Sequence, residues 1–192
     1  MEHKGTAVLE TERLILRKFA MTDAEAAFKN WTSSDAVTKY LRWETHADVS
    51  VTREYIAYQL EQYKTPDHYD WMITLKESGE PIGSIGAVDI KEEICAVEVG
   101  YCIGEKWWRR GFTSEALARV IEFFFKEVGA NRVWSEHDVN NPNSGKVMLK
   151  CGLKYEGTLR QADRNNMGLC DTAVYGIIAE EYENGACSKA FQ

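Results

Sequence analysis

Apolar and polar residues alternate most regularly between residues 97 and 103. The apolar positions are Val97, Val99, Tyr101 and Ile103, and the positions between them are Glu98, Gly100 and Cys102. A period of two residues predicts a β-strand with one buried face. From residue 112 the apolar period lengthens to that of a helix, which we expect to end at Gly129.

The same reading of the whole chain predicts seven strands and four helices. The expected strands cover residues 14–17, 69–76, 82–90, 97–103, 132–137, 154–160 and 172–178. The expected helices cover residues 22–32, 48–64, 112–128 and 142–151. Strand–helix–strand units mixed with hairpins predict an α/β (mixed α+β) sheet with helices on both faces.

The composition indicates one folded domain. The chain has 192 residues, of which 44% are hydrophobic and 28% charged. A chain of this length buries roughly 70% of its unfolded surface, so we expect a single domain over residues 1–192, with a tail at 184–192. The net charge of −7 disfavours nucleic acids and anionic membranes as partners.

Cysteine and histidine usage points to a reduced, metal-free protein. None of the five cysteines forms a C-x-x-C pair, and the four histidines form no ligand cluster. The cysteines are Cys95, Cys102, Cys151, Cys170 and Cys187. No apolar run spans a membrane and no signal-peptide pattern opens the chain, so we predict a cytoplasmic protein with no metal and no membrane partner.

A basic turn that contains glycine joins the regular strand to the long helix. It reads Trp107-Trp108-Arg109-Arg110-Gly111-Phe112-Thr113-Ser114. The first amides of a helix lack intrahelical partners and favour anions, and a glycine lets a ligand approach the backbone. Lys106, Arg109 and Arg110 add positive charge to an acidic chain. This predicts a site for a pyrophosphate or a phosphorylated nucleotide, with a plain solvated helix start as the alternative.

Three stretches resemble the GNAT acetyltransferase superfamily. Residues 97–116 resemble its motif A. Asn141-Pro142-Asn143-Ser144, with residues 147–157 behind it, is similar to motif B. Residues 10–17 resemble the first strand of the RimJ/RimL-type branch. The resemblance covers a core of about residues 9–182 and implies a mostly antiparallel, twisted sheet of about seven strands, splayed between its fourth and fifth strands.

The resemblance also implies that acetyl-CoA is the cosubstrate and lies in that splay. Backbone groups of Tyr101, Cys102 and Ile103 would pair with its pantetheine arm, and Asn141 and Ser144 would contact the same arm. Asn141 could instead cap the following helix. The pyrophosphate would bind the backbone amides of Arg109, Arg110, Gly111, Phe112, Thr113 and Ser114.

Three side chains are candidates for proton transfer. Glu98 is the candidate general base, and His137 is a second candidate proton carrier. Met148 stands where the family often has a tyrosine that protonates the leaving thiolate, so Ser144 is the candidate substitute. Each has a structural alternative: a carboxylate that orients a neighbour, a structural histidine, and an ordinary first-turn serine. A backbone N–H near Ile103 is the expected oxyanion donor.

The expected reaction is acetylation of a primary amine by direct attack in a ternary complex. We expect the N-terminal α-amine of a protein or peptide, because its pKa of about 7.7–8.0 leaves more neutral amine at pH 7 than a lysine with a pKa of about 10.4. The alternatives are a small-molecule amine, such as an antibiotic, a polyamine or an amino acid, and a non-catalytic CoA-binding regulatory module. The protein is expected to be a monomer or a homodimer.

Overall fold

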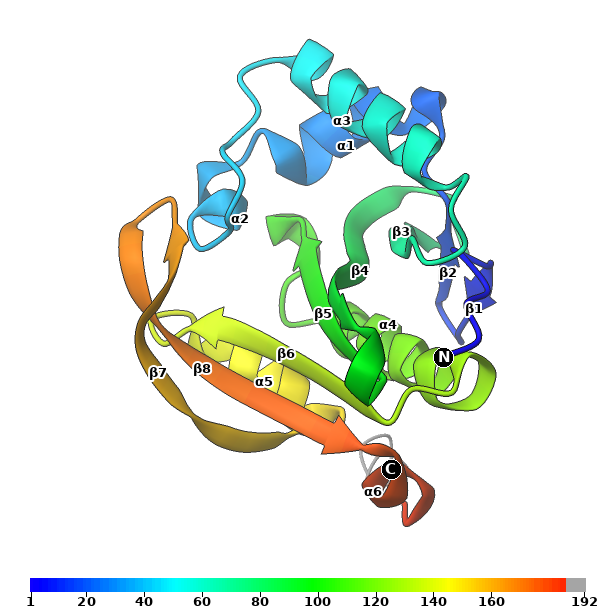
Figure 1. Ribbon diagram of the computed structural model, residues 1–192. Coiled ribbons are helices and arrows are strands. Elements are labelled where there is room, and N and C mark those ends of the chain that lie inside the picture. Colours follow the sequence, from blue (N-terminus) through cyan, green and yellow to red (C-terminus); the bar gives the residue numbers. More distant parts are fainter. Residues whose placement is uncertain (186–192) are drawn as a thin grey trace.

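An open eight-stranded sheet forms the centre of the computed structural model, which describes residues 1–185 (Figure 1). Along the sheet the strands run in the order β1-β2-β3-β4-β5-β6-β8-β7. They are β1 (Leu9–Glu10), β2 (Leu14–Arg17), β3 (Asp70–Leu75), β4 (Pro81–Lys91), β5 (Ala96–Ile103), β6 (Arg132–Asp138), β7 (Lys154–Asn165) and β8 (Gly168–Ile178). Neighbouring strands are antiparallel except β5 and β6, which are parallel.

Helices cover both faces of the sheet, as predicted (Figure 1). One face carries α4 (Phe112–Phe123) and α5 (Pro142–Lys150). The other face carries α1 (Ala24–Ala27), α2 (Asp35–Thr38) and α3 (Val49–Gln62), and α6 (Ala179–Glu183) follows β8. No helix within residues 1–185 is both long and apolar enough to cross a membrane.

Side-chain alternation along β3 explains why the sheet has a core on each face. Trp71 and Ile73 point into the larger core beneath α4, whereas Met72 points to the opposite face and packs with Trp31 and Ile56. All five side chains are at most 2% exposed. Burying a side chain of this size contributes about 1.5–3 kcal/mol, so both faces hold their helices firmly.

Strands β5 and β6 pair over three residues and then separate. The pairs are Ala96 with Arg132, Val97 with Val133, and Glu98 with Trp134. On its other edge β5 pairs with β4 as far as Ile103. The β6-side edge of β5 beyond Glu98 therefore has no strand partner, and the predicted splay is confirmed.

Several elements differ from their predicted bounds. The sheet has eight strands rather than seven because the two-residue β1 leaves no apolar period. Strands β7 and β8 are longer than expected, since bulges after Tyr155 and Leu159 break the alternation. The expected helix at 22–32 is a 3₁₀ turn, then α1, then a π-type turn (Phe28–Thr32). The predicted tail beyond residue 185, including Cys187, lies outside the described residues.

Candidate active site

A cavity of about 390 Å³ lies where β5 and β6 separate. Its walls come from these two strands, the β7–β8 hairpin, the start of α5 and the segment 40–43 before α3. It brings together six of the predicted site residues, which are Glu98, Tyr101, Cys102, His137, Asn141 and Ser144. The predicted turn residues 109–114 lie outside this cavity, at the start of α4.

Strand alternation places the candidate proton carriers on two sides of the splay. Glu98 is paired with Trp134, so Glu136, two residues further along β6, shares the face of Glu98. Tyr101 and His137 have the opposite parity and face α5. Glu98 and His137 therefore lie on opposite faces of the sheet.

Glu98 is a buried carboxylate without a hydrogen-bond donor. Its residue is 6% exposed, and no hydrogen bond reaches its side chain from the described part of the chain. Burial, with a smaller contribution from the nearby Glu136, raises the pKa of Glu98 to about 7, against the opposing effect of Arg42, whose Nη2 lies 3.7 Å from Oε1. A carboxyl with this pKa both accepts and releases a proton near neutral pH.

Across the splay, Tyr101 reaches from β5 to α5. Its hydroxyl lies 3.0 Å from both the carbonyl oxygen and the Oγ of Ser144. Because a carbonyl only accepts, Tyr101 donates to it and the Ser144 hydroxyl donates to Tyr101. Burial raises the pKa of Tyr101 well above its ordinary value, so this hydroxyl stays protonated at neutral pH. Met148, which stands where the family often has a tyrosine, is fully buried in the core.

His137 is held in one orientation. Its Nδ1 lies 2.7 Å from the carbonyl oxygen of Asp138, which accepts the hydrogen bond, so the neutral ring carries its lone pair on Nε2. That Nε2 is buried and has no hydrogen-bond partner within residues 1–185. It packs against Gly145, where an added Cβ would lie 2.6 Å away, and the ring stacks on Tyr175.

Asn141 stands at the N-cap position of α5 without acting as a cap. Its side chain makes no capping hydrogen bond, and Pro142 follows it at the first helical position. The residue instead lines the cavity. Asn141 is thus the N-cap residue of α5 by position, as the alternative predicts, although its side chain makes no capping hydrogen bond, and its contact with the cosubstrate stays a prediction.

The turn before α4 aims backbone amides outward. Gly111 (φ 81°) and Arg109 (φ 60°) both adopt the left-handed conformation. Phe112 and Ser114 are buried, at 5% and 4% exposed, whereas Arg109 and Arg110 are exposed and Gly111 and Thr113 are half-buried. Such a helix N-terminus is suited to a phosphate group.

An open strand edge, a cavity at the splay and a helix N-terminus beside a basic turn are features that suit acetyl-CoA. Residues 13–154 match the family model described as an acetyltransferase (GNAT) domain. The chain belongs to the GNAT acetyltransferase family. It is an acetyl-CoA-dependent N-acetyltransferase.

Known proteins of this family resemble the chain over most of its length. The uncharacterized N-acetyltransferase YoaA of Bacillus subtilis (strain 168) is 34% identical over 171 residues, which is 89% of this chain and 96% of the relative. A GNAT-family acetyltransferase from Bacillus anthracis superposes with a TM-score of 0.79 at 25% identity, over 91% of this chain and 99% of that one. The ribosomal-protein-serine acetyltransferase of Escherichia coli (strain K12) is 30% identical over 112 residues, or 58% of this chain and 63% of the relative.

Sequence reasoning missed a charged cluster in the cavity of this GNAT acetyltransferase. Arg42, in the loop before α3, contacts the carboxylates of Glu98, Glu136 and Asp163, the last at 2.8 Å. The loop is anchored to the β7–β8 hairpin, because the Asn166 side chain donates to the carbonyls of Thr38, at the end of α2, and of Trp43, in the loop, at 2.9 Å each. No local pattern connects segments this far apart in the chain.

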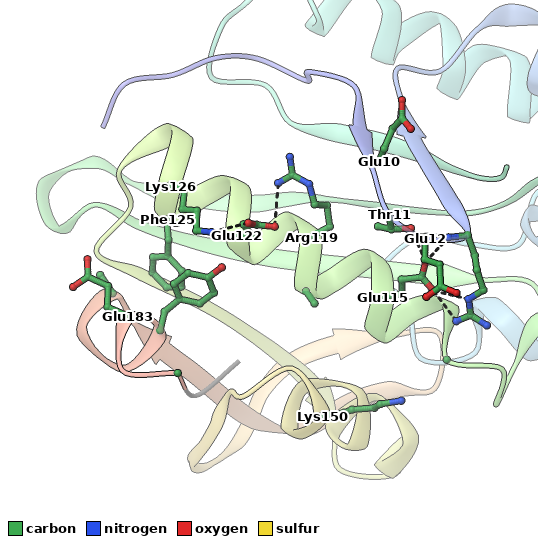
Figure 2. A pocket seen from close by; sticks show the side chains of 16 residues that line it. Glu10, Thr11, Glu12, Glu115, Arg119, Glu122, Phe125, Lys126, Lys150 and Glu183 are labelled. Atoms are coloured by element: carbon green, nitrogen blue, oxygen red, sulfur yellow. Dashed lines mark hydrogen bonds and ion pairs between the residues drawn. The ribbon is translucent and has the colours of Figure 1, made fainter. Parts of the chain in front are cut away.

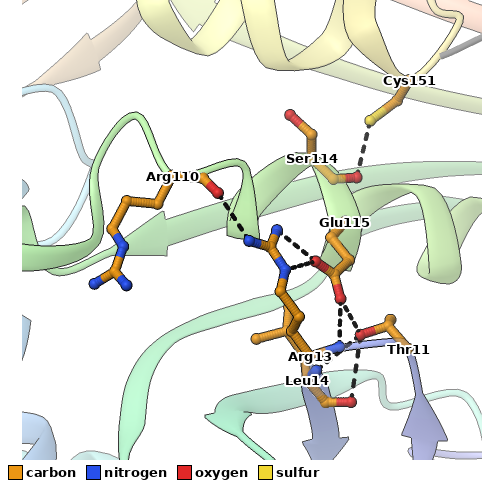
Figure 3. Close-up of polar contacts among 7 residues, drawn as sticks. All are labelled: Thr11, Arg13, Leu14, Arg110, Ser114, Glu115 and Cys151. Carbon is orange, nitrogen blue, oxygen red and sulfur yellow. Dashed lines mark hydrogen bonds and ion pairs between the residues drawn. The ribbon is translucent and has the colours of Figure 1, made fainter. Parts of the chain in front are cut away.

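Two cations beside the α4 N-terminus were also missed. An added Cβ on Gly111 would lie 3.5 Å from Nη2 of Arg13 and 3.9 Å from Nζ of Lys150. Arg13 is held by Glu115, which accepts from its backbone N–H at 2.8 Å, from its Nε at 2.7 Å and from Thr11 Oγ1 at 2.5 Å (Figure 3). Burial alone would raise the pKa of Glu115, but these hydrogen bonds outweigh it and hold the pKa below its ordinary value.

A larger open groove of about 1300 Å³ runs along α4 from this corner toward α6 (Figure 2). Its lining mixes both charges, with Glu122 bridging Arg119 and Lys126. The Gly111 end of the groove carries Arg13 and Lys150. Among the described residues, no three His, Cys, Asp or Glu side chains are grouped to hold a metal ion.

Proposed function

We propose that this enzyme acetylates a primary amine by direct attack in a ternary complex, with Glu98 as the general base. The observation that carries the proposal is the state of Glu98, a carboxylate that is 6% exposed and receives no hydrogen bond from residues 1–185. It stands at the last pair before β5 and β6 separate. An ammonium group that enters the cavity meets a base whose pKa lies near neutrality.

The proposed chemistry separates proton removal from proton delivery. Acetyl-CoA supplies the thioester: its acetyl carbon bonds to the amine nitrogen while the carbon–sulfur bond breaks. Glu98 takes the proton that the ammonium loses. On the α5 side, the Ser144–Tyr101 hydroxyl pair delivers a proton to the sulfur and regains one from the second proton that the nitrogen loses as the amide forms. His137 Nε2, which carries a lone pair, is a further proton acceptor on that side.

The residues that bind acetyl-CoA follow from the open edge of β5 and the start of α4. Backbone groups of Tyr101, Cys102 and Ile103 hold the pantetheine arm together with the Asn141 side chain. The Ile103 carbonyl already accepts from Trp108 Nε1 at 2.8 Å, so the arm finds its acceptors earlier on the strand. The amides of residues 109–114 hold the pyrophosphate, and the side chains of Arg109 and Arg110 add positive charge.

The first candidate acceptor is the N-terminal α-amine of a protein or peptide. The pKa of an α-amine is lower than that of a lysine side chain, so a larger fraction of the α-amine is already neutral at pH 7 and Glu98 has less to deprotonate. A relative that covers part of the chain acts, by its name, on serine of a ribosomal protein. With this acceptor, the enzyme would belong to the RimJ/RimL-type branch of the family.

The second candidate acceptor is a small-molecule amine. The observation that favours it is the pair of hydrogen bonds from the Asn166 side chain to the carbonyls of Thr38 and Trp43. These contacts join the β7–β8 hairpin to the loop before α3 over the face of Glu98. A cavity of about 390 Å³ accommodates a compact amine more readily than a folded chain end.

A thiol-release assay with acetyl-CoA tests the proposal over a panel of peptides and small amines. We expect acetylated product, identified by mass spectrometry, from one of the two classes. Peptides alone support the α-amine acceptor, and small amines alone support the second candidate. Tight binding of acetyl-CoA with no product from any amine would contradict the proposal and indicate a non-catalytic CoA-binding module.

A further inference from the structure

The cavity holds more negative than positive charge on the side of Glu98. Glu98, Glu136 and Asp163 surround one guanidinium, that of Arg42. One cation leaves two of these three carboxylates without a countercharge. Charges enclosed in a protein are screened less than charges in open solvent, so this imbalance attracts cationic ligands.

Other charged groups near the cavity do not correct the imbalance. Lys91 lies 3.9 Å from Asp89 on the same strand, so these two charges offset each other. Asp138 adds a further carboxylate, which accepts hydrogen bonds from the backbone and side chain of Asn140 and from Asn165. These donors are neutral, so they leave the charge of Asp138 in place.

Glu136 and Asp163 keep acceptor capacity in addition to their contacts with Arg42. The guanidinium takes Oε1 of Glu136 and Oδ2 of Asp163. The second oxygen of each carboxylate has no hydrogen-bond donor within residues 1–185. A carboxylate accepts about four hydrogen bonds, so both can bind a second cation while Arg42 stays in place.

A buried hydroxyl in the same wall has no adequate partner. Thr172 is 1% exposed and lines the cavity on β8. Beyond the thiol of Cys170, a weak hydrogen-bonding group, its Oγ1 has no partner in the described part of the chain. Cys170 is paired with Asp163 across the hairpin, and Thr172, two residues further along β8, has its side chain on the same face and is paired with Asp138 of β6. A buried hydroxyl without a partner costs about 1–3 kcal/mol, which a bound ligand would recover.

A cation bound to Glu136 would lie close to an amine that Glu98 deprotonates. Nη2 of Arg42 contacts both Glu98 and Glu136, so the proposed base and this carboxylate are neighbours. The Asn166 side chain joins the β7–β8 hairpin to residues Thr38 and Trp43. Because Glu98 and Glu136 contact the same nitrogen of Arg42, a ligand whose two ammonium groups reach both carboxylates is short.

We propose that the acceptor carries a second positive charge, a short spacer away from its reacting amine, and that Glu136, Asp163 and Thr172 bind it. The inference rests on the proposed function and specifies its substrate class. Two sources offer this chemistry: a small diamine, and a peptide whose first residues are basic. Both present an ammonium with three hydrogen-bond donors to two carboxylates and a hydroxyl.

Matched acceptors test the proposal by kinetics. Diaminobutane and aminobutanol differ by one ammonium in place of a hydroxyl, and seryl-lysine amide and seryl-norleucine amide form the peptide pair. In at least one pair we expect kcat/KM to be about tenfold or more higher for the dication, after correction for equivalent amines. The pair that shows this preference identifies the source. Equal values within both pairs would overturn the proposal.

Charge-removing variants connect the preference to the site. Asp163→Asn and Glu136→Gln keep the side-chain shape, and each should reduce the ratio of dication to monocation kcat/KM by about tenfold. Glu77→Gln removes the same charge from an exposed turn and should leave the ratio unchanged. A ratio that survives in both cavity variants would overturn the proposal, and the second variant covers a failure of the first to fold.

Calorimetry separates this inference from the proposed function. The dication of the preferred pair, or diaminobutane if no amine is acetylated, is titrated into the protein saturated with CoA, where no acetyl group can move. Binding that weakens about tenfold in Asp163→Asn supports the subsite even if no acceptor turns over. Absence of binding to the wild-type protein would overturn it, whatever the outcome of the acetylation assay.

Discussion

At the residue scale, the proposed substitute for the tyrosine that motif B lacks is the hydroxyl pair of Tyr101 and Ser144. Ser144→Ala removes one of the two hydrogen bonds of Tyr101 and leaves the one to the backbone carbonyl. We expect turnover to fall a fewfold, because a thiol with a pKa of about 8.5 already leaves tolerably well without an acid. Calorimetry should show unchanged acetyl-CoA affinity. Unchanged turnover would reduce Ser144 to an ordinary residue of the first helical turn.

Asp70 provides a prediction about stability. Burial raises its pKa to about 7, although Tyr55 donates a hydrogen bond to it at 2.7 Å. A raised pKa in the folded state means that wild-type stability is lost as pH rises toward 7. Asparagine does not titrate, so the stability of Asp70→Asn relative to wild type should increase as pH rises from 5 to 8.5. We expect an increase on the order of 1–2 kcal/mol, because Asp70 lines the cavity and solvent there limits the effect.

Melting temperatures measured across that pH range test this prediction. Glu77→Gln serves as the control, because it removes one negative charge from an exposed turn. We expect the control to differ from wild type by a constant amount at all pH values. A constant difference for Asp70→Asn as well would show that this carboxyl titrates normally.

Individual residues were predictable where a local pattern marks them. Glu98 stands out because a carboxylate interrupts an otherwise apolar or small strand, and Asn141 because a proline follows it. Arg42 and Asp163 were not predictable, since they meet Glu98 only through the packing of a loop on a distant hairpin. The orientation of His137 also depends on a backbone contact that no sequence pattern reveals.

At the element scale, the start of α4 is the part that we propose to bind acetyl-CoA through its backbone. Gly111→Val places a branched side chain in a left-handed residue beside Arg13 and Lys150. Gly129→Val is a matched control, because Gly129 has φ 76° and open space around its Cβ position. Both should lose roughly 1–3 kcal/mol of stability through backbone strain.

Only Gly111→Val should also lose acetyl-CoA affinity, by about tenfold or more, because it blocks charge-assisted hydrogen bonds to the pyrophosphate. Calorimetry on the folded variants measures this directly. Equal affinities in the two variants would show that the α4 start is not the phosphate site.

Elements with a long, regular period were predicted well. The strand at 97–103 and the helix from 112 to 128 agree with β5 and with α4 and its π-type extension to Val128. Elements that are short or bulged were not. β1, α2 and α6 have two, four and five residues, and the β7–β8 hairpin carries bulges that shift its alternation.

At the scale of the whole molecule, the splay is the feature that the apolar pattern could not predict. Periodicity locates β5 and β6 but does not say that they separate after three pairs. That expectation came from the resemblance to the GNAT family. The separation brings the loop before α3, β6 and the β7–β8 hairpin onto one carboxylate of β5, that of Glu98.

The assignment of Glu98 as the general base is tested most directly by the pH dependence of kcat/KM for wild type and Glu98→Gln. Glutamine keeps the shape of the side chain and removes its basicity. We expect the wild-type rate to rise through about pH 7 as Glu98 ionises, and the variant to be slower by about 10²–10⁴-fold near neutrality. The loss should shrink at higher pH, where solution supplies more neutral amine, while acetyl-CoA affinity stays constant. A small loss that is the same at every pH would contradict the assignment of Glu98 as the base.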